Sequence, residues 1–200
     1  LATYNYPVML HGILELYALW PTGRQGDLAD THISQVGRYA DKIREVAGPS
    51  RATFMVLQAF AWENLREKGR DPAMVLYPSR AALRFMAWQA IVHGANGILW
   101  WGLAHTPQEA PLWSDLVSVV KEIRTHLAAL SAAPDKLSLS LTYHDTGHSL
   151  DRGVEWIAKP SGDRYLLIMV NADPNPVDVS LEGARGLDSA EGEPAGHAVI

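Results

Sequence analysis

The stretch Gly94-Ala95-Asn96-Gly97-Ile98-Leu99-Trp100-Trp101-Gly102 decides how the first two-thirds of this chain can fold. It is a short apolar run framed by glycines, with an amphipathic segment before it and a longer one after it. A buried strand of a parallel sheet has this pattern, because it runs between two covering helices. Neighbouring side chains of a strand point to opposite faces, so at most one of the two tryptophans faces a ligand. We expect this one tryptophan to lie at the carboxyl end of a parallel strand, where α/β barrels place their active sites.

Strands and helices alternate on both sides of this run. The expected strands cover residues 2–9, 53–60 and 97–101, and the expected helices cover residues 33–47, 79–93 and 112–130. Three strand–helix units in succession imply a parallel sheet with helical crossovers. Three units alone leave a sheet with two bare edges, which is a poor autonomous fold. We therefore interpret this α/β pattern as the second half of a (β/α)8 TIM barrel, of which it supplies about three βα units.

The pattern changes near residues 133–137. Short strand-like segments at 137–143, 154–158, 165–171 and 177–181 follow, separated by Gly, Pro, Asn and Asp. This is typical of an antiparallel sheet or sandwich. We predict two domains: residues 1–133 as the C-terminal part of the barrel, and residues 134–200 as a truncated β-sandwich-like domain. Both ends of the chain are strand-like, so we expect a fragment that needs the upstream half of the barrel, or another chain, to complete the fold.

Composition excludes several classes of function. A net charge of −5 argues against nucleic acid as a partner, since phosphate binding needs clustered Lys and Arg. No apolar run approaches the ~18 residues of a membrane span, so we expect no membrane insertion. With no cysteine there is no thiolate chemistry, and the eight histidines lack ligand spacing. We therefore expect no metal and no other cofactor. Seven tryptophans, a high number for this length, favour a carbohydrate partner.

Four segments carry a resemblance to a known family. They are Asn5-Tyr6-Pro7, the strand MVLQAFAW at 55–62, the helix RFMAWQAIVHGA at 84–95, and GILWWG at 97–102. Together they resemble the second half of the TIM-barrel glycoside hydrolases of the β-galactosidase, β-glucuronidase and cellulase clan, whose members are often followed by a small β-sandwich. The likeness covers residues 1–133 and is strongest over 52–102. It implies hydrolysis of O-glycosidic bonds in a polysaccharide or oligosaccharide by two carboxylates, and it favours a secreted or periplasmic location.

The resemblance also implies roles for particular residues. By position, the tyrosine that ends the clan's sixth strand falls on Tyr6, and the platform tryptophan of its eighth strand falls on Trp100 or Trp101. The nucleophilic glutamate of the seventh strand falls on Gln58, which departs from the pattern. An amide cannot form the glycosyl-enzyme intermediate. The general acid would lie at the end of the fourth strand, outside this chain.

Two other carboxylates are candidates for catalysis. Glu63 lies five residues past Gln58. It either projects over the barrel mouth as a base or nucleophile, or starts a charged, solvated turn. Glu15 lies between Leu14 and Leu16 in a long loop, and apolar surroundings suit a carboxyl group to act as an acid.

The remaining candidates are binding residues. Gln58, a polar residue in an apolar strand, either holds a substrate hydroxyl or ties two strands together. His105 follows the last strand at the barrel mouth. The candidate carbohydrate-binding residues are Asn5, Tyr6, Gln58, Trp62, Trp100, Trp101 and His105.

Functions of different classes stay open at this point. The first is a glycosidase, incomplete or inactive as this fragment. The alternative is a non-catalytic carbohydrate-binding relative that has lost the nucleophile, as Gln58 permits. A third is an unrelated barrel enzyme such as a lyase or aldolase, although the segment 102–105 lacks a glycine-rich phosphate turn. The tryptophan pair supports a carbohydrate ligand better than it supports hydrolysis.

Overall fold

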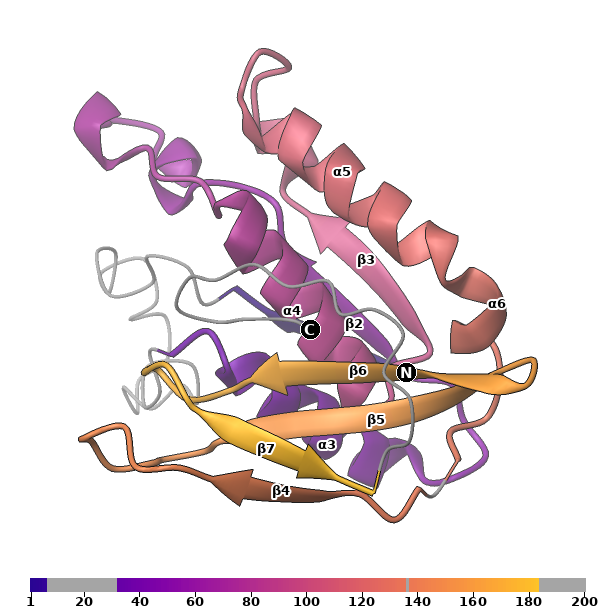
Figure 1. Cartoon of the computed structure of the whole chain (residues 1–200). Helices are drawn as coiled ribbons and strands as arrows, with labels where there is room; N and C mark the ends of the chain where they lie inside the picture. The colour runs from indigo at the N-terminus through magenta and orange to yellow at the C-terminus, as the bar shows by residue number, and fades with distance from the viewer. Residues whose placement is uncertain (7–31, 136, 184–200) are drawn as a thin grey trace. The chain divides into compact units, whose positions relative to one another are not determined.

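A computed structural model describes residues 1–6, 32–135 and 137–183 of the chain (Figure 1). The chain divides into two compact units, Leu1–Val119 and Val120–Ile200. The first unit holds a parallel sheet with helices, and the second holds antiparallel strand pairs. The mixed α/β character predicted from the sequence is confirmed.

The sheet of the first unit has three parallel strands, with β2 in the middle. The strands are β1 (Ala2–Asn5), β2 (Phe54–Gln58) and β3 (Gly97–Trp101). The helices that follow them in sequence are α3 (Gln35–Ala47), α4 (Arg80–Val92) and α5 (Leu112–Thr125). The alternation of strand and helix is therefore as predicted. The single helix expected over 112–130 is interrupted at His126, after which the short α6 (Leu127–Leu130) begins.

The two faces of this sheet differ in character. Met55 and Leu57 of β2 are fully buried, and theirs is the face covered by α3 and α4, which pack against the strands. The opposite face carries Phe54, Leu99 and Trp101, which are 38%, 51% and 41% exposed. In a barrel of parallel strands, the face turned away from the helices is the interior one. Large apolar side chains are thus exposed on the face of the sheet that α3 and α4 leave uncovered.

Local sequence signals explain the helix that leads into β3. Ser79 begins α4 as its N-cap, and its Oγ accepts a hydrogen bond from the backbone N–H of Ala82 at 3.2 Å. Leu83, Met86 and Ala87 are buried, as their spacing predicts, but burial extends around the whole helix, since every residue from Leu83 to Ala90 is buried. This burial fixes α4 against the sheet and so fixes where the chain enters β3.

The second unit contains two antiparallel strand pairs (Figure 1). They are β4 (Ser140–Tyr143) with β7 (Val179–Glu182), and β5 (Val154–Ser161) with β6 (Arg164–Asn171). The antiparallel strand arrangement predicted for this part of the chain is confirmed. It begins after α6, whereas the division into compact units falls earlier, inside α5.

A buried carboxylate joins two turns of the second unit. Asp173 Oδ2 accepts the backbone N–H groups of Asp151 at 2.7 Å and Arg152 at 3.1 Å, and Oδ1 accepts that of Asn175 at 3.0 Å. Burial by itself raises the pKa of Asp173, but hydrogen bonds from the backbone at Asn175, Arg152, Asp151 and Gly153 outweigh it and lower the pKa to about 2. The ionised carboxylate therefore holds these turns together.

We expect Asp173→Asn to lower the free energy of unfolding of the second unit by about 1–3 kcal/mol, because an amide nitrogen cannot accept these N–H groups. The pKa of Asp173 falls from its ordinary 3.8 to about 2 on folding. The carboxylate's contribution is therefore complete above about pH 5 and is lost as the pH falls toward 2. Urea denaturation at pH 7 and near pH 2 measures both effects, and the difference between wild type and variant should shrink at the lower pH.

The matched control is Asp163→Asn in the exposed turn between β5 and β6. It should leave the unfolding curve at pH 7 unchanged. Equal stability of wild type and Asp173→Asn at pH 7 would contradict the role given to this carboxylate.

Candidate functional site

Four aromatic rings meet at the carboxyl ends of the three parallel strands. Tyr6 directly follows β1, Phe60 and Trp62 follow β2, and Trp101 ends β3. The ring centroid of Phe60 lies 5.4 Å from that of Tyr6 and 4.9 Å from those of Trp62 and Trp101, each pair edge to face. This arrangement is favoured by the ring quadrupoles. We call these four residues the aromatic cluster.

Tyr6 and Trp101 stack on each other across the end of β2. Their ring centroids are 5.5 Å apart and their planes are inclined by 25°. Because β2 lies between their strands, and neighbouring strands are about 4.8 Å apart, the two rings must lean together over it. Gln58 pairs with Trp101 in the register of the sheet and is fully buried. The stack therefore covers the end of β2, where Gln58 lies.

The amide of Gln58 has a local partner. Its Nε2 donates a hydrogen bond to the backbone carbonyl of Phe60 at 3.0 Å. The contact ties the end of β2 to the segment that carries the central ring of the aromatic cluster. Gln58 thus helps to position Phe60, and the full burial of its side chain leaves no surface that a ligand can reach in this conformation.

A glycine allows the Phe60 ring to reach its position. Gly102 has a φ of +95°, and a Cβ built there would lie 2.4 Å from Cδ1 of Phe60. Any larger residue would meet both the backbone strain and the ring. Next to this contact, Thr106 Oγ1 donates to the carbonyl of Ala59 at 3.0 Å, and so joins the loop after β3 to the loop after β2.

The two tryptophans of β3 lie on opposite faces of the sheet. Trp101 belongs to the aromatic cluster, whereas Trp100 pairs in register with Leu57, on the face that the helices cover. The exposed ring of His105 lies beside Trp101, with centroids 5.5 Å apart and planes inclined by 35°. Of the two tryptophans, Trp101 is therefore the one at the candidate site.

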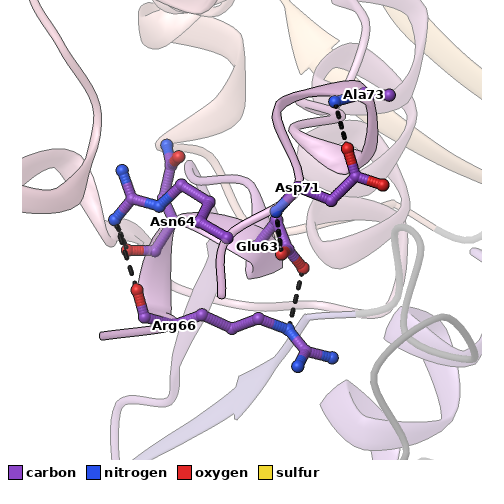
Figure 2. Close-up of polar contacts among 6 residues, drawn as sticks. Glu63, Asn64, Arg66, Asp71 and Ala73 are labelled. Atoms are coloured by element: carbon purple, nitrogen blue, oxygen red, sulfur yellow. Dashed lines mark hydrogen bonds and ion pairs between the residues drawn. The ribbon is translucent and has the colours of Figure 1, made fainter. Parts of the chain in front are cut away.

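Glu63 is buried inside its own loop rather than solvated (Figure 2). Its Oε2 pairs with Nε of Arg66 at 2.9 Å, and its Oε1 accepts the backbone N–H of Asp71 at 2.8 Å. Asp71 in turn accepts the N–H of Ala73 through Oδ1 at 2.9 Å. Both oxygens of Glu63, which is 5% exposed, thus stabilise the loop. Attack on a substrate by Glu63 would require these contacts to be released.

The structure brings most of the sequence-predicted binding residues into one place. Tyr6, Trp62, Trp101 and His105 come together, and Gln58 lies beneath them. Asn5 is the last residue of β1, and its side chain is not among those that the structure describes. Glu15, the second candidate carboxylate, lies outside the described residues.

Two residues that build this site were not singled out from the sequence. The sequence predicts Phe60 as the last residue of an apolar strand, whereas β2 ends at Gln58 and the Phe60 ring belongs to the aromatic cluster. Gly102 was noted only as the end of an apolar run. Its position directly after Trp101 was the available signal, because a glycine at a strand end often permits close packing.

Comparisons of the chain with known protein families, with curated proteins and with solved structures found no match. Within the described residues, no three His, Asp or Glu side chains are grouped so that they could hold a metal ion. No helix in the described ranges is long and apolar enough to cross a membrane.

We expect Gly102→Ala to disrupt the aromatic cluster. Overpacking against Phe60 costs about 1–3 kcal/mol. The positive φ adds about 1 kcal/mol to the loss of stability. Near-UV circular dichroism should lose aromatic signal, and urea denaturation should show the loss of stability.

Gly69→Ala is the matched control, since Gly69 has a φ of +66° with no atom within 4 Å of a built Cβ. It should show the backbone strain without the change in the aromatic spectrum. Identical spectra and stabilities of the two variants would show that Gly102 has no special role in packing Phe60.

Proposed function

We propose that this chain belongs to a glycoside hydrolase-like (β/α)8 barrel and that its aromatic cluster binds a carbohydrate. The observation that carries the proposal is the indole of Trp101, which is 41% exposed at the carboxyl end of a parallel strand and lies beside Tyr6 and His105. The C–H face of a sugar ring packs on such a π surface while its hydroxyls stay free. The carboxyl ends of parallel strands are also where α/β barrels bind their ligands.

The barrel is supported by the apolar face of the sheet. Phe54 and Leu99 are exposed on the side away from α3 and α4, where further βα units of a barrel would bury them. Such units would come from an upstream half of the barrel or from another chain, and would also pair with the outer edges of β1 and β3. In the same proposal, the antiparallel strands of the second unit belong to a β-sandwich.

Binding is better supported than hydrolysis for the described residues. Gln58 is an amide and cannot act as the nucleophile. Glu63 uses both of its oxygens to stabilise its loop. A glycosidase needs two carboxylates on either side of the scissile bond. Hydrolysis would therefore depend on Glu15 or on carboxylates from the rest of the barrel, and otherwise the chain is the non-catalytic, carbohydrate-binding relative.

We expect Trp101→Ala to weaken carbohydrate binding at least about tenfold, because the variant loses the π surface on which the sugar packs. Trp101→Phe should keep part of the affinity, since a smaller ring remains. Isothermal titration calorimetry of the full chain with cellopentaose, xylopentaose, mannopentaose and laminaripentaose measures both effects.

The matched control is Leu99→Ala, which removes another exposed apolar side chain from the same face of the same strand. It should leave the affinity unchanged. Equal affinities of wild type and Trp101→Ala would refute the proposed site, as would the absence of binding to all of these oligosaccharides.

Glu63→Gln separates a catalytic role from a structural one. We expect about 1.5–3 kcal/mol less stability in urea, because the charged hydrogen bonds to Arg66 and Asp71 are weakened. Any turnover of a chromogenic glycoside should stay within a few-fold of wild type, measured at a temperature where both are folded. A fall in turnover of about 10²–10⁴-fold with unchanged stability would instead make Glu63 a catalytic residue. Glu15→Gln in the same assay tests the other carboxylate.

A further inference from the structure

Asn64 connects the loop after β2, the segment before α4 and the loop after β3. Its Nδ2 donates to the hydroxyl oxygen of Tyr77 at 2.8 Å and to the backbone carbonyl of His105 at 3.0 Å. A carbonyl oxygen can only accept, so the nitrogen of the amide must be the atom that faces His105. The same nitrogen faces Tyr77, and the direction of both hydrogen bonds is therefore fixed.

This direction leaves polar groups available around Asn64 and His105, and the ring of His105 lies beside Trp101. Since the hydroxyl oxygen of Tyr77 accepts from Asn64, its own hydrogen is free to donate, and it has no acceptor in the described part of the chain. Among the described residues, Oδ1 of Asn64 and the ring nitrogens of His105 likewise have no hydrogen-bond partner. Asn64 and Tyr77 are half-buried and His105 is exposed.

We propose that Tyr77 and His105, positioned by Asn64, form a polar subsite that recognises the hydroxyl groups of a sugar ring bound at Trp101. Tyr77 donates a hydrogen bond to a sugar hydroxyl, and the His105 ring offers a donor and an acceptor. His105 links the subsite to Trp101, because its backbone carbonyl accepts a hydrogen bond from Asn64 while its ring lies against the indole. This inference rests on the proposed carbohydrate binding, and it assigns the selectivity of that site to residues outside the aromatic cluster.

Tyr77→Phe tests the subsite because it removes only the hydroxyl and keeps the ring. Affinity for whichever of the four oligosaccharides binds wild type best should fall about three- to tenfold, the usual effect of one lost neutral hydrogen bond. In a series of monodeoxy analogues of that oligosaccharide, the analogue lacking the contacted hydroxyl should bind wild type and Tyr77→Phe equally. Loss of a purely structural contact would not produce this dependence on one ligand hydroxyl.

Asn64→Asp tests the positioning role. The carboxylate introduced cannot donate to Tyr77, so the tyrosine hydroxyl donates to the carboxylate and is no longer available to the ligand. The carboxylate also cannot donate to the carbonyl oxygen of His105, so affinity should fall at least as far as in Tyr77→Phe. Adding Tyr77→Phe to Asn64→Asp should cause little further loss. Full additivity of the two losses would overturn the positioning role.

The matched control is Tyr39→Phe, the same change at a half-buried tyrosine of α3, whose hydroxyl has no hydrogen bond in the described part of the chain. It should bind like wild type. The subsite proposal is overturned if Tyr77→Phe binds as tightly as wild type while Trp101→Ala has lost affinity, a result that leaves the proposed function intact. If wild type binds none of the four oligosaccharides, both the subsite proposal and the proposed function are overturned.

Discussion

The packing of the Phe60 ring against the backbone at Gly102 is the contact on which the site depends. The ring lies edge to face against Tyr6 and Trp101, which come from the two outer strands of the sheet. A Cβ at position 102 would occupy the space of this ring. With the ring in place, the ends of β1, β2 and β3 are joined by side-chain packing as well as by the backbone ladder. The partly exposed indole of Trp101 is therefore supported by packed side chains from all three strands.

The polar groups around the aromatic cluster are of two kinds: some stabilise the fold, and others remain available to bind a ligand. Glu63 is bound by Arg66 and by the backbone N–H of Asp71, and Gln58 donates a hydrogen bond to the carbonyl of Phe60. Their hydrogen-bonding capacity stabilises loops, since a buried polar group without a partner is costly. Around the aromatic cluster, within the described ranges, Tyr77 and His105 carry a donor or acceptor without a partner, and both are less buried than Glu63 and Gln58. This division favours recognition of a ligand at the surface of the cluster over chemistry beneath it.

The sequence predicted regular elements better than their ends. The bounds of β3 at residues 97–101 follow from its apolar run and its glycines. The strand expected to reach Phe60 ends at Gln58, because the ring of Phe60 leaves the sheet to pack against three other aromatic residues. Likewise, periodicity alone predicted one helix over 112–130, whereas His126 interrupts it. In both places a local pattern continued past the point where the chain turns.

The amino-acid pattern alone predicts the order of parallel strands and helices, the antiparallel strands after α6 and the position of one tryptophan at a strand end. These features follow from continuous apolar runs, from short strand-like segments between turn residues and from the helical period of 3.6 residues, all of which are local patterns. Three features are visible only in the folded chain: Trp101 rather than Trp100 joins the site, Glu63 is buried in an ion pair with Arg66, and Asn64 faces Tyr77 and His105. Strand pairing sets the face of the sheet on which a residue lies, and the packing of separate loops sets the partner of each polar atom.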